Sequence, residues 1–216
     1  MKINILNFEK LPVIEKRRSA FYQLGVERCS IIKKFPEVYE RLMGVLKFLF
    51  HFSPENDTFI KRAYLQAALS EFVSIEEILF NDLKNNEIKL EELKIRKTQN
   101  PLFHILKQFR NFNIHLGVSK IEYTEPVEIV RGSEEIVEKG EGLEYMEEFA
   151  IIDNLNLQEF NKLKDAKSYI EEDKIHMIDW FNHNQKKWGV AHLIYIAALQ
   201  YCDEIIIKYD LKKNAR

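Results

Sequence analysis

The stretch FIKRAYLQAALSEFVSIEEIL, residues 59–79, carries the clearest secondary-structure signal in the sequence. Its apolar residues recur at steps of three and four, which is the spacing of one face of an α-helix. They are Phe59, Ala63, Leu65, Ala68, Leu69, Phe72, Ile75 and Leu79. Alanine and leucine dominate the stretch, and both are strong helix formers. We therefore expect a long helix here, and an all-α fold around it.

Further helices follow from the same pattern on either side. We expect them over residues 13–34, 36–51, 54–84, 101–117, 156–186 and 188–209. Pro36, Pro54 and Pro101 each precede an apolar-periodic run, where proline suits the first helical turn. The run VAHLIYIAALQYCDEIII, residues 190–207, is apolar nearly all round. It is either the central helix of a bundle or a dimer interface.

Residues 119–152 differ in character, because KIEYTEPVEIV at 120–130 alternates apolar and polar residues. This alternation predicts a small β-hairpin inserted into a single helical domain that spans residues 1–216. Residues 122–148 hold ten Glu against Arg131 and Lys139, a local charge of −8. Residues 89–110 hold six Lys or Arg against two Glu, a local charge of +4. These runs are either solvated faces or a basic surface with an acidic flap over it.

The composition excludes several classes of protein. With 46% hydrophobic residues and a net charge of −2 in 216 residues, the chain is neither disordered nor a polybasic coat for nucleic acid. Two cysteines, Cys29 and Cys202, fit a reducing cytoplasm better than a disulfide scaffold or a zinc–thiolate site. We see no signal peptide and no unbroken apolar run of about 18 residues, so we expect no membrane span.

The segment NPLFHILKQFRNFNIHLG, residues 100–117, contains the candidate site. Asn100 can cap a helix that starts at Pro101 and ends near Gly117. On a helical wheel the apolar residues form one stripe, which comprises Leu102, Ile105, Leu106, Phe109, Phe112 and Leu116. The polar residues gather on another face, which comprises His104, Lys107, Gln108, Asn111 and His115, with Arg110 beside them.

These polar residue types suit phosphodiester cleavage without a metal or another cofactor. A neutral histidine can take a proton from a 2′-hydroxyl, and a protonated one can donate to a leaving oxygen. Arginine offers a planar set of donors to the negatively charged phosphorane. Asparagine can orient the imidazole or hold a phosphate oxygen. RNA is the expected substrate, because DNA lacks the 2′-hydroxyl.

The motif RNFNIH, with Arg110, Asn111 and His115, resembles the signature of the HEPN (higher eukaryotes and prokaryotes nucleotide-binding) domains. The resemblance implies a helical bundle and a metal-independent endoribonuclease of a prokaryotic toxin or defence system. It assigns catalytic roles to Arg110 and His115, with Asn111 assisting. It also implies a homodimer, in which two motifs share one cleft, and an antitoxin or regulatory protein as a possible partner.

Two further expectations accompany this resemblance. His104 and Lys107 are expected to contact RNA phosphates beside the motif. In the branch of the family that is paired with nucleotidyltransferases, a tyrosine stands two residues after the histidine. Gly117 occupies that position here, which argues against control by tyrosine AMPylation.

Two other functions remain open at this stage. One is a catalytically silent module of the same fold that binds nucleotide, RNA or a protein. The other is a helical-bundle metalloprotein that uses a stripe at steps of four, three and four, namely Glu172, His176, Asp179 and His183. The competing interpretation of this stripe is the polar side of an amphipathic helix. No second Glu-x-x-His pairing supports a di-metal site.

Overall fold

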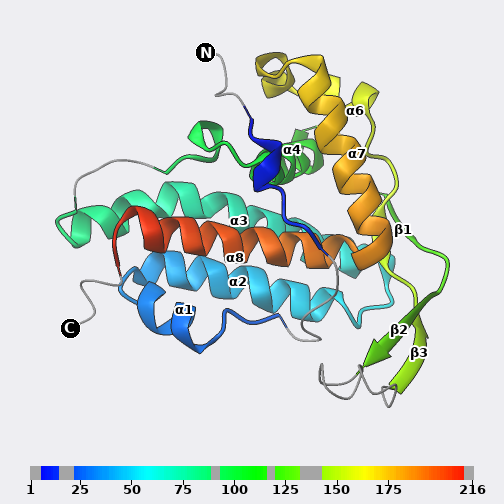
Figure 1. Cartoon of the computed structure of the whole chain (residues 1–216), viewed down its shortest axis with the longest axis horizontal. Coiled ribbons are helices and arrows are strands. Elements are labelled where there is room, and N and C mark those ends of the chain that lie inside the picture. Colours follow the sequence, from blue (N-terminus) through cyan, green and yellow to red (C-terminus); the bar gives the residue numbers. More distant parts are fainter. Residues whose placement is uncertain (1–5, 15–21, 89–92, 116–119, 132–142, 212–216) are drawn as a thin grey trace.

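The fold is a bundle of α-helices with a small antiparallel β element, as the sequence predicts (Figure 1). The structure, a computed structural model, describes residues 6–14, 22–88, 93–115, 120–131 and 143–211. Side chains that pack in its core come from every helix longer than five residues among these ranges.

Three helices lie side by side and form the base of the bundle: α2 (Pro36–Phe52), α3 (Thr58–Asn85) and α8 (Val190–Lys208) (Figure 1). The α2–α3 hairpin is capped twice by aspartate. Asp57 accepts the backbone N–H groups of Phe59 and Ile60, and so begins α3. Asp82, near the other end of α3, accepts the backbone N–H of Val38 in the first turn of α2 at 2.8 Å.

The apolar helix α8 is the central helix of the bundle, in agreement with one of the two sequence interpretations. It contacts α1 (Val26–Ile32), α2, α3, α4 (Pro101–His115) and α7 (Glu171–Trp188). By length and composition α8 could cross a membrane, but 67% of its apolar window is buried inside the bundle. Burial of this kind is usual for a core helix of a folded domain.

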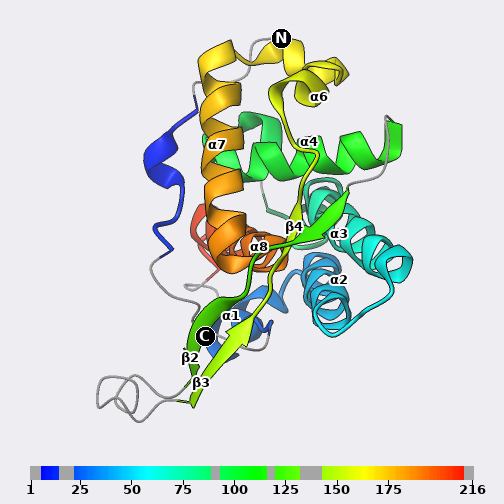
Figure 2. The ribbon, with the colours of Figure 1, turned by 90° about the vertical axis from the view of Figure 1, so that its right-hand side faces the viewer.

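Helices α4 and α7 cross the base helices on one side of the bundle (Figure 2). An aromatic cluster joins the two layers. The ring of Phe72 in α3 lies 5.9 Å from Phe103 in α4 and 5.7 Å from Tyr201 in α8. Phe103 and Tyr201 are themselves 5.1 Å apart. All three side chains are fully buried, so this cluster fixes where α4 sits on the bundle.

The β element between α4 and α7 is made of two antiparallel pairs. Strand β1 (Ile121–Tyr123) pairs with β4 (Ala150–Ile152), and β2 (Val127–Arg131) pairs with β3 (Leu143–Glu147). Gln185 of α7 anchors the inner pair, because its buried amide donates to the carbonyl of Ile152 and accepts its N–H. The outer pair extends away from the helices (Figures 1 and 2).

Two predicted helix starts are wrong. Of the helix expected over 13–34, the described residues 13–14 and 22–25 are not helical and Val26–Ile32 are, after Gly25 with φ of +77°; residues 15–21 lie outside the described ranges. A positive φ breaks a right-handed helix, and glycine adopts it at little cost. The helix expected from residue 54 begins at Thr58, because Asp57 supplies a better N-cap than the turn at Pro54.

The single helix expected over 156–186 is also wrong. The chain forms α6 (Leu157–Asn161), a 3₁₀ turn at Lys164–Ser168 and then α7. The breaks allow four residues to be buried together, namely Phe160, Leu163, Ala166 and Tyr169. One straight helix would point these side chains in different directions. At the other end of α7, Gly189 with φ of +79° turns the chain into α8.

Candidate functional site

Helix α4 carries the motif, and it starts as the sequence predicts. The side chain of Asn100 accepts the backbone N–H of Leu102 at 3.0 Å, and Pro101 is the first helical residue. The helix ends at His115 in the described part of the chain, and Gly117 lies outside the described residues. Arg110, Asn111 and His115 therefore all belong to the last two turns of one helix.

The N-terminal part of α4 is surrounded on nearly all sides, which the helical wheel does not anticipate. Leu102, Ile105, Leu106 and Phe109 face the core as expected. His104 and Gln108, expected on the polar face, are buried as well, at 1% and 3% exposure. The reason is that the 3₁₀ turn and the residues after it cover this face of α4, which places Tyr169 against both side chains.

His104 has two hydrogen bonds that define its protonation. Its Nε2 lies 3.1 Å from the carbonyl oxygen of Thr98, which can only accept, so Nε2 carries the proton. Nδ1 then accepts from the hydroxyl of Tyr169 at 2.9 Å, and that hydroxyl accepts from the amide of Gln108 at 3.3 Å. Burial lowers the pKa of His104 to about 4, against a smaller opposing effect of the Thr98 hydrogen bond. His104 is thus a neutral core residue, and the position does not suit the phosphate contact that we expected.

Lys107 is also committed to an internal partner. Its ammonium forms an ion pair with Oε1 of Glu76 in α3, and the side chains are only 19% and 9% exposed. The other oxygen, Oε2, accepts the backbone N–H of Ile95 at 2.8 Å. This carboxylate therefore fastens α4 and the segment before it to α3, and a phosphate would have to compete with it for Lys107.

Arg110 and Asn111 lie where α4 becomes half-buried. Nη1 of Arg110 donates to Oδ1 of Asn111 at a long 3.4 Å. Nε of Arg110 is buried without a hydrogen-bond partner among the described residues. No carboxylate within the described ranges forms an ion pair with this guanidinium. The imidazole of His115 lies outside the described part of the structure.

The alternative metal stripe lies on α7, where His176, Asp179 and His183 line one pocket that Glu172 does not reach. Glu172 and His183 are eleven residues apart, which is about 16 Å along a helix. His176 packs edge-on against the ring of Phe8, with the ring centroids 5.2 Å apart. Among the described residues, no three His, Cys, Asp or Glu side chains are grouped closely enough to hold a metal ion.

Two residues that position the motif helix escaped the sequence interpretation. Glu76 shares a helical face with the buried Phe72 and Leu79, and a charge within an apolar stripe signals an internal partner. Tyr169 had no such local signal, because its partners His104 and Gln108 lie 65 and 61 residues away.

The chain matches no known family model, no characterised protein and no solved structure. A guanidinium with no carboxylate partner in the described part of the chain, next to an amide on the half-buried end of a helix, can bind a phosphate oxygen.

Proposed function

We propose that the chain is a HEPN-like, metal-independent endoribonuclease that acts as a homodimer in the cytoplasm, within a prokaryotic toxin or defence system. One observation carries the proposal. Of the two cations on α4, Lys107 is neutralised by Glu76, whereas Arg110 has no carboxylate partner among the described residues. Arg110 also lies beside Asn111, five residues before the histidine that ends the helix.

In the proposed reaction the chain supplies a proton acceptor, a proton donor and a positive charge that stabilises the phosphorane. An imidazole of His115 takes the proton of the 2′-hydroxyl, and the 2′-oxygen attacks the adjacent phosphorus. Arg110 donates hydrogen bonds to the phosphorane oxygens as negative charge develops there. The bond from phosphorus to the 5′-oxygen breaks, and a protonated imidazole donates to that oxygen. The products are a 2′,3′-cyclic phosphate and a 5′-hydroxyl, and Asn111 orients the imidazole or the phosphate.

The test is cleavage of a labelled RNA in the presence of EDTA by wild type, Arg110→Ala, His115→Ala and Asn111→Ala. We expect the first two variants to lose about 10³-fold in rate, and Asn111→Ala to lose less. Arg96→Ala is the matched control, because Arg96 is an exposed arginine in the same basic segment. Cleavage that survives in both Arg110→Ala and His115→Ala would contradict the proposal.

The same experiment addresses the alternatives. RNA binding by wild type without any cleavage would identify a catalytically silent module. Activity that disappears in EDTA and returns with manganese or zinc would point to a metalloenzyme. Light scattering reports the oligomeric state, and a monomer that cleaves RNA at the full rate would remove the shared cleft from the mechanism.

A further inference from the structure

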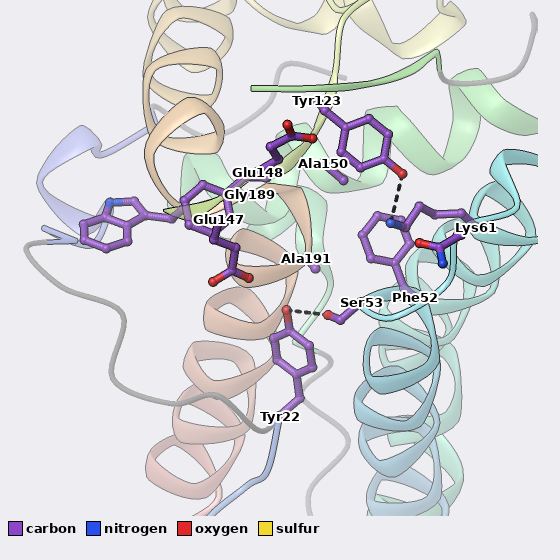
Figure 3. Close-up of a pocket in the computed structure, with 13 residues that line it drawn as sticks. Tyr22, Phe52, Ser53, Lys61, Tyr123, Glu147, Glu148, Ala150, Gly189 and Ala191 are labelled. Carbon is purple, nitrogen blue, oxygen red and sulfur yellow. Dashed lines mark hydrogen bonds between the residues drawn. The ribbon is translucent and has the colours of Figure 1, made fainter. Parts of the chain in front are cut away.

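A cavity of about 400 Å³ opens where the helical base meets the β element (Figure 3). Its walls come from the ends of α2 and α7, the first turns of α3 and α8, and strands β1, β3 and β4. None of the residues that line it belongs to α4, so the cavity is separate from the Arg110 site.

Lys61 lies in the wall of this cavity and is buried to an unusual degree for a lysine, with 4% exposure. Its ammonium donates to the hydroxyl of Tyr123 at 3.1 Å and lies 5.0 Å from the centre of that ring. The ring of Phe52 lies 5.1 Å away on another side. No carboxylate of the described residues pairs with Lys61. Aromatic faces offset only part of the cost of burying a charge, so an ammonium with no carboxylate partner among the described residues still favours an anion beside it.

Two groups at this end of the cavity still have hydrogen atoms to donate. An ammonium has three N–H groups, and one hydrogen bond of Lys61 goes to Tyr123. The hydroxyl of Tyr123 accepts that bond, which leaves its own proton free for another acceptor. Figure 3 shows the two groups next to one another, beside the ring of Phe52. A group whose single negative charge is shared by two oxygens, such as a carboxylate, would accept from both groups and supply the missing charge.

The other residues that line the cavity limit which kind of ligand can carry this anionic group. Glu147 and Glu148 also line it, and Figure 3 shows the Glu147 carboxylate on the side of Gly189, across from Lys61. Carboxylates at this position repel ligands with several negative charges, such as phosphates and nucleic acids. Phe149 and Trp188 add aromatic wall, which favours an apolar body.

We propose that this cavity binds a small monocarboxylate with an apolar body, whose carboxylate accepts hydrogen bonds from Lys61 and Tyr123. The oxygens of the ligand then neutralise the buried ammonium, and its apolar part occupies the aromatic wall. A free acid and an amino acid share this chemistry. They differ in whether an ammonium near the carboxylate also reaches Glu147.

Calorimetric titration of the full chain tests the proposal with four probes. These are 3-phenylpropionate, its alcohol 3-phenylpropanol, L-phenylalanine and inorganic phosphate. We expect one 3-phenylpropionate per chain, an affinity about tenfold lower for the alcohol, and no binding of phosphate. Tighter binding of L-phenylalanine than of 3-phenylpropionate would support an amino acid as the occupant, and the reverse order would support a free acid.

Single substitutions distinguish the effect of the charge of Lys61 on ligand binding from the effect of the shape of the cavity. Lys61→Met should weaken 3-phenylpropionate by about tenfold and affect the alcohol much less, because the variant loses the positive charge and its N–H donors but keeps a side chain of similar length. Tyr123→Phe removes one donor and should weaken the carboxylate by a smaller factor. Lys47→Met, at an exposed lysine of α2, is the matched control and should bind as wild type does.

Circular dichroism of each variant shows whether it is folded. If Lys61→Met does not fold, Tyr123→Phe still tests the proposal. Three results would overturn the proposal. They are equal carboxylate affinity in wild type and in both folded variants, phosphate binding as tight as carboxylate binding, and a folded wild type that binds neither carboxylate.

Discussion

Lys107 of α4 and Glu76 of α3 form a largely buried ion pair at the crossing of the two helices, and the same carboxylate holds the backbone N–H of Ile95. Lys107→Leu leaves a carboxylate in the interior without its cation. We expect the free energy of unfolding to fall by about 2 kcal/mol, less than for a fully buried pair because Lys107 keeps some solvent contact. Urea denaturation followed by circular dichroism measures this change.

The double variant Glu76→Gln with Lys107→Leu is the control for that pair. Glutamine still accepts the N–H of Ile95 but carries no charge, so we expect the double variant to be more stable than Lys107→Leu alone. A stability of Lys107→Leu within about 0.5 kcal/mol of wild type would show that the pair contributes nothing.

Buried His104 should make the stability of the protein depend on pH. The unfolded chain takes up a proton near the usual pKa of 6.5, whereas the folded chain resists it until about 4. The contribution is therefore complete above pH 6.5 and is lost as the pH falls through the window between these two values. We expect a loss of about 2 kcal/mol between about pH 7 and about pH 5 from this group.

His104→Gln supplies the matched comparison in denaturation curves at several pH values. An amide keeps one donor for Thr98 and one acceptor for Tyr169 but does not titrate. The variant should thus lose less stability than wild type on acidification. Parallel pH profiles for the two proteins would mean that His104 is not held neutral by burial.

Asp82 should contribute more to stability than an ordinary helix cap. It is fully buried, and Ala at this position leaves the N–H of Val38 without an acceptor in the interior. We expect Asp82→Ala to cost about 2 kcal/mol and Asp57→Ala, at the exposed cap of α3, to cost about 1 kcal/mol. Thermal and urea unfolding of both variants compare them, and the reverse order would refute this assignment.

Arg110→Lys distinguishes a clamp on the phosphorane from a general attraction for RNA. Lysine keeps the charge but loses the planar set of donors, so we expect cleavage to slow by about 100-fold. RNA affinity at fixed salt should stay near that of wild type, because the number of phosphate charges neutralised is unchanged. Single-turnover cleavage and filter binding measure the two quantities. An unchanged cleavage rate would exclude a role for the guanidinium geometry.

Much of the fold could be predicted because α2, α3 and α4 each bury an apolar face, which leaves a regular period in the sequence, and because α8 is a long run that is apolar nearly all round. The period fails between residues 156 and 171, where short segments bury Phe160, Leu163 and Tyr169 one after another with turns between them. The spacing of apolar residues does not reveal such turns, because they depend on packing against parts of the chain that are distant in the sequence.

The surroundings of the candidate site were harder to predict than the motif itself. A helical wheel assigns polar residues to solvent, which holds for a helix packed on one side only. Helix α4 is packed on several sides, and His104 and Lys107 meet partners that are distant in the sequence. Their polarity indicated that they make specific contacts, but not that these contacts are internal.

The way α4 is held has a consequence for how the motif is kept in place. Its first turns are enclosed by the aromatic cluster, the Glu76 carboxylate and the Tyr169 hydroxyl, while the end that carries Arg110 is only half-enclosed. The position of Arg110 is thus set mainly by contacts that α4 makes about two turns before it. A substitution far from any substrate, such as at Phe72 or Tyr169, would misdirect the guanidinium while the bundle as a whole remained folded.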